Sequence, residues 1–394
     1  MERLKKLSDT KSREVDDAFR RFLYDRIEWE QRLILILGHR GTGKTTLLLQ
    51  RMKEYGSDAI YLTLDDIYFE ANRLIHLIDT LYEEGYRRFF LDEVHRYVHW
   101  SKDLKNAFDN YSDIQITATG SSILEVSKGQ ADLSRRAAIY QLPGLSFREF
   151  LRLDVQVAFD IVPLDTILQS HHELAAGYYE RADILTSFRK YLRTGYYPFF
   201  KESEKSYPQK LLETTWLVLD IDIAPYEELH HSSIRNMKKL LYVIGQSVPF
   251  KPNISKLAEK LGVSRNSVLK MLDALDRARV LSLLKSDTRG ISYLQKPEKI
   301  YLGNPNLAYL LSSGKPETGT LRETFFLNHL QVNHNVTFSR WADFMIDDTW
   351  TFEVGGPGKT DEQIRGVPNA YIAADRIKGG SGNRIPLWLF GFLY

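Results

Sequence analysis

Apolar residues in the first third of the chain form short runs separated by stretches with helical spacing. The runs are LILIL (33–37), AIYLTL (59–64), FFLD (89–92) and IQITATG (114–120). Strands that are apolar throughout and alternate with helices are typical of a parallel sheet whose two faces are both covered. The pattern therefore predicts an α/β fold for residues 1–150, in which an amphipathic helix within residues 1–30 packs on the sheet.

The remainder of the chain changes its pattern twice. Residues 151–245 are mostly helical, residues 246–295 contain short helices, and residues 296–394 return to strands with aromatic content. Because the changes in periodicity are the signal for a boundary here, we expect four segments that meet near residues 150, 245 and 295.

Composition narrows the class of protein. The 394 residues include 53 Lys and Arg, 51 Asp and Glu, and no cysteine, which leaves a net charge of +2. This balance excludes a globally basic nucleic-acid coat, so any basic surface is local. The lack of cysteine excludes disulfides, iron–sulfur clusters and thiol catalysis. No signal peptide is visible and the longest apolar stretch, IPLWLFGFLY, is too short for a membrane span. We therefore expect a cytoplasmic protein without a membrane partner.

The strongest chemical signal is the segment GHRGTGKT (38–45), which matches the phosphate-loop pattern G-x-x-x-x-G-K-[ST] between an apolar strand and a helix. Its glycines let backbone N–H groups surround a phosphate at the N-terminus of the following helix. Lys44 is expected to reach the β- and γ-phosphates of ATP, and Thr45 to ligate Mg²⁺. The residues expected to contact the nucleotide are Gly38, His39, Arg40, Gly41, Thr42, Gly43, Lys44, Thr45 and Thr46.

A second strand, RFFLDE (88–93), ends in two acids downstream of this loop, as a Walker B element does. Asp92 is expected to hold Mg²⁺ through its water shell, and Glu93 to activate the attacking water. The next strand ends in TATGSS (117–122), where Thr119 or Ser121 is expected to contact the γ-phosphate and that water. Hydroxyl residues at strand ends are also common in turns, so the choice between the two stays open.

An arginine pair, Arg135 and Arg136, precedes the next apolar run. An arginine here can complete the site of a neighbouring subunit by stabilising the charge of the transition state. The alternative is an ordinary surface charge pair. We expect a homo-oligomer in which one of the two acts in trans.

Together, HRGTGKTTLL, FFLDEVHR, TATGSS and LSRRAAIYQLPGLSFREFL resemble the prokaryotic AAA-type ATPases of the STAND-related group. The resemblance implies a P-loop NTPase sheet, a helical lid (151–245), a winged helix (246–295) and a C-terminal restriction-endonuclease-like α/β domain (296–394). The family has Gly-Arg where this chain has Arg135 and Arg136, which gives Arg136 the finger position. Its Gly-Gly-Tyr-Pro turn corresponds to residues 195–198, where Tyr196 replaces the second glycine.

Residues 254–281 predict a helix-turn-helix followed by a hairpin-like wing. Gly262 ends the first helix and Ser264 caps the second. Residues 251–290 contain nine Lys and Arg against four Asp and Glu, and a basic helix-turn-helix suits the phosphates and grooves of DNA. The alternative is a helix pair that packs against protein. The candidate DNA contacts are Arg265, Asn266, Lys270, Arg277, Lys285 and Arg289.

The last segment contains acids in the order of the PD-(D/E)xK nuclease core, which it resembles. Glu323, Asp343 and Glu353 would converge on Mg²⁺, for which carboxylates are suitable ligands. The nuclease motif requires a lysine two residues after the last acid, where this chain has Gly355, and the next lysine is Lys359. We expect a degenerate nuclease, although the glycine-rich turn offers a route by which Lys359 returns to the site.

These observations predict an ATP- and Mg²⁺-dependent AAA-type ATPase that associates with DNA through the winged helix and couples turnover to conformational or oligomeric change. Two alternatives stay open: a STAND-type nucleotide switch without nucleic acid, and an ATP-controlled nuclease. A kinase is disfavoured because Glu93 is suited to activating water and no acceptor pocket is visible.

Overall fold

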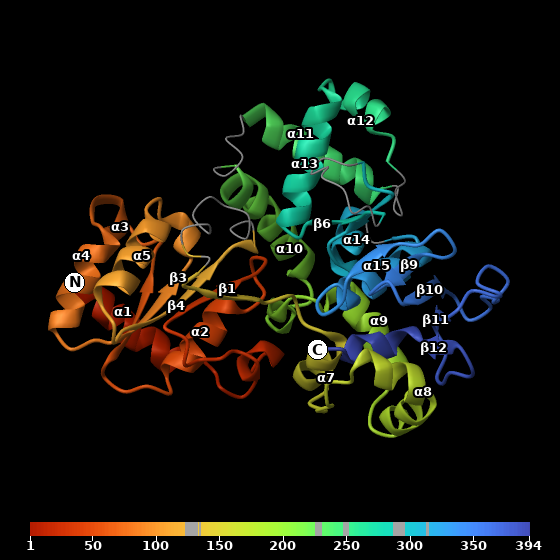
Figure 1. Ribbon diagram of the computed structural model, residues 1–394, viewed down its shortest axis with the longest axis horizontal. Coiled ribbons are helices and arrows are strands. Elements are labelled where there is room, and N and C mark those ends of the chain that lie inside the picture. Colours follow the sequence, from red (N-terminus) through yellow and green to blue (C-terminus); the bar gives the residue numbers. More distant parts are fainter. Residues whose placement is uncertain (123–132, 134, 225–230, 247–251, 287–295, 313–314) are drawn as a thin grey trace. The chain divides into compact units, whose positions relative to one another are not determined.

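The computed structural model describes the chain apart from residues 123–132, 134, 225–230, 247–251, 287–295 and 313–314. The protein forms two compact units, Met1–Pro143 and Gly144–Tyr394 (Figure 1). Each unit has a five-stranded sheet of its own. Among the described residues, no helix has the length and apolar character that crossing a membrane requires. The further boundaries expected near residues 245 and 295 stay predictions.

The first unit is built on a parallel sheet with the strand order β2-β3-β4-β1-β5. Its central strands are almost fully buried, as expected for apolar runs covered on both faces. The α/β fold predicted from the apolar runs is therefore confirmed. β4 lies between β1 and β3, so the ends of these three strands are adjacent. The strands are β1 (Leu33–Leu37), β2 (Ala59–Thr63), β3 (Arg88–Asp92), β4 (Gln115–Gly120) and β5 (Ala138–Gln141).

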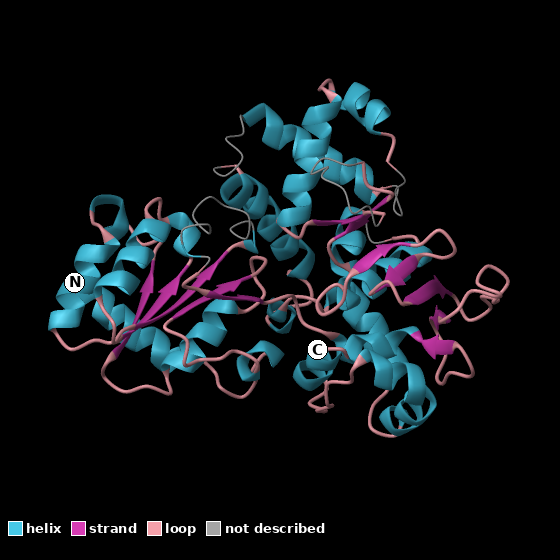
Figure 2. Ribbon diagram, viewed as in Figure 1, coloured by secondary structure: helices cyan, strands magenta, loops and turns pink. Residues whose placement is uncertain are grey.

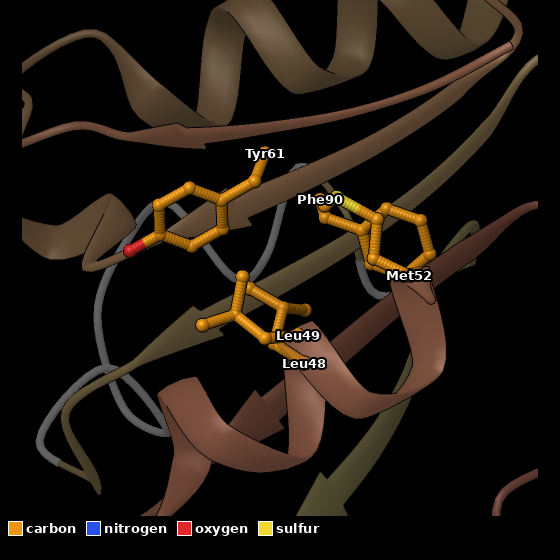
Figure 3. Packing of buried hydrophobic residues seen from close by; sticks show 5 residues of the cluster. All are labelled: Leu48, Leu49, Met52, Tyr61 and Phe90. Atoms are coloured by element: carbon orange, nitrogen blue, oxygen red, sulfur yellow. The ribbon is translucent and has the colours of Figure 1, made fainter. Parts of the chain in front are cut away.

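Helices cover this sheet through apolar faces. Leu48, Leu49 and Met52 of α2 pack against Tyr61 of β2 and Phe90 of β3 (Figure 3). This packing fixes the N-terminal end of α2 relative to the strand ends, where the candidate site lies. The helices are α1 (Glu2–Glu14), α2 (Lys44–Met52), α3 (Tyr68–Ala71), α4 (Leu74–Glu83) and α5 (Trp100–Asn110), with 3-10 turns η1 (Phe22–Asp25) and η2 (Val94–Arg96).

The N-terminal helix is shorter than the predicted span of residues 1–30. α1 ends at Glu14, and Val15 is extended (ψ 131°). The Asp16 side chain then accepts a hydrogen bond from the backbone N–H of Ala18 at 2.8 Å, a local bond that competes with continuation of a helix.

The second unit begins with helices joined by an aromatic core. Phe147 of α7 packs edge-on against Phe188 of α9 and against Phe392 near the C-terminus, and Phe188 packs against Phe325 of α15. Residues far apart in the sequence therefore share one core. The helices are α7 (Phe147–Asp154), α8 (Leu164–Tyr179), α9 (Ile184–Thr194), α10 (Tyr207–Leu217) and α11 (His231–Gly245), with the turns η4 (Pro198–Lys201), η5 (Val218–Ile223) and η6 (Leu387–Phe392).

A helix-turn-helix and a small sheet follow along the chain. The Asn253 side chain caps α12 (Ile254–Leu261), Gly262 ends it with a left-handed backbone (φ +65°), and the Ser264 hydroxyl caps α13 (Arg265–Arg277). β6 (Leu281–Leu284) and β7 (Lys299–Leu302) then pair antiparallel. The helices and the turn lie where the capping residues predicted them.

The second five-stranded sheet has the order β12-β11-β10-β9-β8 (magenta arrows of the second unit in Figure 2). β10, β11 and β12 are parallel, and β8, β9 and β10 pair antiparallel. Phe326 of α15 packs on Phe352 of β10, which joins helix and sheet. The elements are β8 (Val336–Phe338), β9 (Phe344–Ile346), β10 (Trp350–Gly355), β11 (Ala370–Ala374) and β12 (Arg384–Pro386), preceded by α14 (Pro305–Leu311) and α15 (Thr318–Leu330).

Candidate nucleotide site

The phosphate loop connects β1 to α2 in the conformation that its glycines allow. Gly41 and Gly43 have positive φ angles of 83° and 93°, which side chains disfavour. A Cβ atom at Gly38 would lie 2.4 Å from the carbonyl oxygen of Leu142, so this position also has no room for a side chain. The loop ends at the N-terminus of α2, whose free N–H groups and dipole attract a phosphate.

Lys44 is buried within the loop that precedes it. Its Nζ donates to the carbonyl oxygens of Gly38 at 2.8 Å and His39 at 3.0 Å. The ammonium group is therefore held beside the helix N-terminus, where phosphate oxygens would replace these carbonyls as acceptors.

Asp92 is the centre of the site and is 3% exposed. Three hydroxyl groups donate to its carboxylate: Thr45 at 2.8 Å and Tyr61 at 2.9 Å to Oδ2, and Thr119 to Oδ1. Burial and the Asp92 charge raise the pKa of the Tyr61 phenol, which stays a donor. We call Asp92, Thr45, Tyr61 and Thr119 the Asp92 site. Its partners come from the phosphate loop helix and from β2 and β4.

Oxygen ligands at this position suit Mg²⁺. Thr45 Oγ1 and Asp92 Oδ2 are hard donors within 2.8 Å of each other, and the hydroxyl partners of Asp92 carry no charge. The arrangement therefore fits the cation with which P-loop enzymes bind ATP.

Glu93 has a left-handed backbone (φ +54°, ψ +40°), a conformation that costs a non-glycine residue on the order of 1 kcal/mol. The Glu93 N–H donates to Thr119 Oγ1 at 3.2 Å, so Thr119 joins both acids of the predicted Walker B pair. The Glu93 carboxylate lies 3.3 Å from His95 Nε2 and 3.6 Å from Arg40 Nη2. Backbone and side chain of Glu93 are thus fixed by several partners.

His95 orients Glu93 from below. The N–H of Ser121 donates to His95 Nδ1 at 3.3 Å, which assigns the ring proton to Nε2, the atom that faces Glu93. Ser121 therefore acts through its backbone, whereas Thr119 contacts Asp92 with its side chain. Of the two hydroxyl residues left open by the sequence, Thr119 is the one that the geometry joins to the acids.

Sequence reasoning missed Tyr61, His95 and a buried arginine, Arg21. Arg21 donates to the carbonyl oxygens of Thr42 and, at 2.8 Å, Pro143, and so supports the phosphate loop. Tyr61 and His95 carried a usable signal, because each is a polar ring within or directly after an apolar strand. Arg21 carried none, since its role depends on contact with residues far along the chain.

The two arginines proposed as fingers differ in their surroundings. Arg136 forms a bidentate ion pair with Asp109 of α5, with Nε and Nη2 at 2.8 and 3.0 Å from the two carboxylate oxygens, while Arg135 is exposed. Arg136 would have to leave Asp109 to serve a neighbouring subunit. Neither arginine is placed against Asp92 or Glu93 by a contact within the described part of this chain.

Comparison with known proteins identifies the first unit. Residues 30–151 match the family model described as an AAA domain. These residues form an AAA domain. The match spans β1 to α7 and includes the phosphate loop, Asp92, Glu93 and Thr119, so the α/β fold with its parallel sheet is a P-loop NTPase of the AAA type. Residues 185–318 match a second model, a domain of unknown function.

Relatives of the AAA domain and of the second unit occur in Methanocaldococcus jannaschii. One uncharacterized protein is 28% identical over 64% of this chain and 56% of its own length, and another is 24% identical over 79% of this chain and 70% of its own length. The chain thus spans little more than half of the first relative.

Solved structures with similar chains include the RuvB Holliday junction branch migration motor of Thermotoga maritima (20% identity, 72% of this chain, 89% of that chain, TM-score 0.28). The Aeropyrum pernix Orc1 protein in complex with DNA covers 77% and 92% at 13% identity (TM-score 0.31). AMPPCP-bound DnaA from Aquifex aeolicus covers 69% and 88% at 15% identity (TM-score 0.28). The assignment of the AAA domain rests on the family match and the sheet.

The predicted DNA contacts are unevenly available. Arg265, Asn266 and Lys270 lie exposed on the first half of α13. Arg277 is engaged by Asp273 at 2.7 Å on the same helix, and Lys285 is half-buried. Arg289 lies outside the described residues. The geometry therefore concentrates the accessible candidates at the N-terminal half of the second helix.

The residues that resemble a nuclease core are brought together in the second unit. Glu323 lies on α15, Asp343 directly before β9 and Glu353 within β10. Lys359 forms an ion pair with Glu353, so the glycine-rich turn does return this lysine to the acids. Lys299 of β7, which sequence reasoning missed, contacts both Glu323 and Asp343.

Proposed function

We propose that this protein hydrolyses ATP at the Asp92 site with Mg²⁺, and that it couples hydrolysis to binding of DNA by α13. The observation that carries the proposal is the convergence on Asp92 of hydroxyl groups from the phosphate loop helix and β4. A phosphate loop alone binds nucleotide. A fixed acid beside a carboxylate and a polar strand end adds the means to orient water.

The division of roles follows from the contacts. Lys44 and the N-terminus of α2 bind the phosphates of ATP, and Thr45 and Asp92 hold Mg²⁺, which supplies the charge that the phosphoryl group needs. Glu93 accepts a proton from the attacking water, and Thr119 keeps Glu93 in register with Asp92. His95 and Arg40 set the direction of the Glu93 carboxylate.

The DNA partner is supported by the exposed positive end of the helix-turn-helix. Arg265, Asn266 and Lys270 are accessible on α13, and the surrounding residues 251–290 are rich in Lys and Arg. Electrostatic binding of this kind weakens steeply as salt rises, because each contacted phosphate releases counterions. An oligomer in which Arg136 or Arg135 reaches a neighbouring site belongs to the same proposal.

The test is ATP turnover of the purified protein with and without duplex and single-stranded DNA across a salt series. We expect stimulation by DNA that fades with salt, and loss of turnover in Glu93→Gln but not in Glu70→Gln, which changes an exposed acid of α3. No turnover in the wild type under any of these conditions would refute the ATPase assignment.

The DNA part is tested separately with Arg265→Ala/Lys270→Ala. Its matched control is Lys256→Ala/Lys260→Ala, which removes the same charge from exposed positions of α12. We expect the α13 variant to lose stimulation and to reduce the salt slope by about two, one for each phosphate contact. Turnover that is indifferent to DNA in the wild type, with changes of oligomeric size on nucleotide exchange, would favour the nucleotide switch instead.

A further inference from the structure

Three buried carboxylates and two lysines form a cluster at the second sheet. The side chains of Glu323, Asp343 and Glu353 are 12%, 13% and 4% exposed. The N–H of Val354 donates to Asp343 Oδ2 at 3.0 Å, which ties Asp343 to the strand that carries Glu353. A cluster of acids at such a place requires positive charge, because burying unpaired carboxylates is costly.

Lys299 supplies one of these charges from the heart of the cluster. Its Nζ lies 3.1 Å from Glu323 Oε2 and 2.8 Å from Asp343 Oδ1, and its side chain is 12% exposed. Tyr301, two residues further along β7, donates to the same Glu323 oxygen at 2.6 Å. Because side chains two apart share a face of a strand, β7 presents an ammonium and a phenol together to these acids.

Lys359 supplies the second charge and replaces the missing motif lysine in space. A Cβ atom at Gly355 would lie 2.7 Å from both Cβ and Cγ of Lys359, so the Lys359 side chain fills the place of a side chain at position 355. Its Nζ pairs with Glu353 Oε1. Within the described residues, Glu353 Oε2 is buried without a hydrogen-bond partner.

The cluster does not fit a divalent cation as it stands. A cation that joined Glu323 and Asp343 would need the oxygens that Lys299 already occupies, and Mg²⁺ requires them at about 2.0–2.1 Å. Among the described residues, no group of three or more His, Asp and Glu side chains has an arrangement that could hold a metal. Burial alone would lower the pKa of Lys299, but Glu323 and Asp343 outweigh it and raise that pKa, so the lysine stays charged at neutral pH.

We infer that Lys299 is the built-in cation of this cluster: its ammonium group takes the place of a divalent metal ion between Glu323 and Asp343. The second unit therefore contains a metal-independent ion cluster at the position where the nuclease core binds Mg²⁺. Loss of Lys299 leaves three carboxylates with Lys359 alone, and their hard oxygens then form a site for a divalent cation.

The test is Mn²⁺ binding to the full chain without nucleotide, followed by electron paramagnetic resonance of free Mn²⁺. We compare the wild type, Lys299→Met, Lys299→Met/Glu353→Gln, and Lys296→Met, which removes an exposed lysine three residues earlier. We expect no bound Mn²⁺ in the wild type or Lys296→Met, one ion per chain in Lys299→Met, and its loss in the double variant.

Two results would overturn the inference. One is a wild-type protein that binds Mn²⁺ in a manner abolished by Glu353→Gln, and the other is a folded Lys299→Met protein that binds none. If Lys299→Met does not fold alone, its melting transition is followed in 10 mM Mn²⁺ and 10 mM K⁺ (about the upper range for weak sites). Recovery by Mn²⁺ and not by K⁺ supports the inference, and recovery by neither contradicts it.

Discussion

The two units each bury carboxylates beside a sheet, but they neutralise them with partners of different charge. Asp92 accepts three hydrogen bonds from hydroxyl groups, whereas Glu323 and Asp343 share the ammonium of Lys299 and Glu353 pairs with Lys359. Hydroxyl donors orient a carboxylate without cancelling its charge, so the Asp92 site keeps its attraction for a cation. Lysines cancel the charge within the chain. A cluster of acids therefore predicts a metal site only when the partners of the acids are known.

Removing the charge of Asp92 tests the first half of this comparison and has the largest expected effect. Asp92→Asn preserves an acceptor for the three hydroxyl groups but removes the attraction for Mg²⁺. We expect ATP turnover to fall by about 100-fold or more, since a metal ion contributes several kcal/mol to the transition state. Turnover as a function of Mg²⁺ concentration measures this, and an unchanged melting temperature controls for folding. Turnover near the wild-type level would remove Asp92 from the metal site.

Removing the charge of Lys299 tests the second half. Lys299→Met leaves Glu323 and Asp343 buried without their ammonium, and breaking such a pair costs about 3 kcal/mol. We expect the free energy of unfolding of the second unit to fall by this amount in urea titrations. Lys296→Met, which changes an exposed lysine, should stay within about 0.5 kcal/mol of the wild type. Equal stability of the two variants would contradict a buried ion cluster.

The sequence predicted the Asp92 site better than the lysine cluster for a physical reason. Lys44, Thr45, Asp92 and Glu93 belong to local patterns whose spacing follows from a strand, a loop and a helix. The partners of the second cluster follow from tertiary contact: Lys299 lies on a strand 24 residues before Glu323, in a different pairing from the sheet of Asp343 and Glu353. The motif directed attention to position 355, after the last acid, and therefore away from Lys299.

The fold shows the same division between local and distant determinants. Apolar runs predicted the parallel strands β1 to β4, and capping residues predicted α12 and α13, because these signals act within a few residues. The end of α1 at Glu14 was missed, since Asp16 was read as part of a solvated helix face and not as a local acceptor for Ala18. Arg21 and Tyr61 could not be assigned without their distant partners.

A hydroxyl partner of Asp92 provides a smaller perturbation than loss of its charge. Thr119→Val keeps the shape of the side chain but removes the bonds to Asp92 and to the Glu93 N–H. We expect turnover to fall about 10-fold, as for the loss of a hydrogen bond to a charged group, with ATP binding unchanged. Thr117→Val, on the same face of β4, is the matched control and should retain turnover. Equal losses in the two variants would indicate a packing effect on the strand.

A third carboxylate, Asp276 on α13, extends the comparison to an acid whose contact is a backbone group. Its Oδ1 accepts from the Leu283 N–H at 3.0 Å. Burial raises the pKa of Asp276 to about 6, although that bond and the charges of Arg279 and Lys285 lower it. The folded state then keeps a proton that the unfolded state has lost between about pH 4 and pH 6, so this residue reduces stability as pH rises through that window.

Asp276→Asn removes this penalty while keeping an acceptor for Leu283. We expect the variant to be more stable than the wild type by about 1 kcal/mol at pH 8, less than the full value of the pKa shift because the residue is half-buried. At pH 4 the two proteins should unfold alike. Urea titrations at both pH values measure the difference. A variant that is less stable at pH 8 would show that the Asp276 charge is compensated in the folded state, as the lysine cluster is, and that burial with a single backbone donor does not leave this acid exposed to the cost of ionisation.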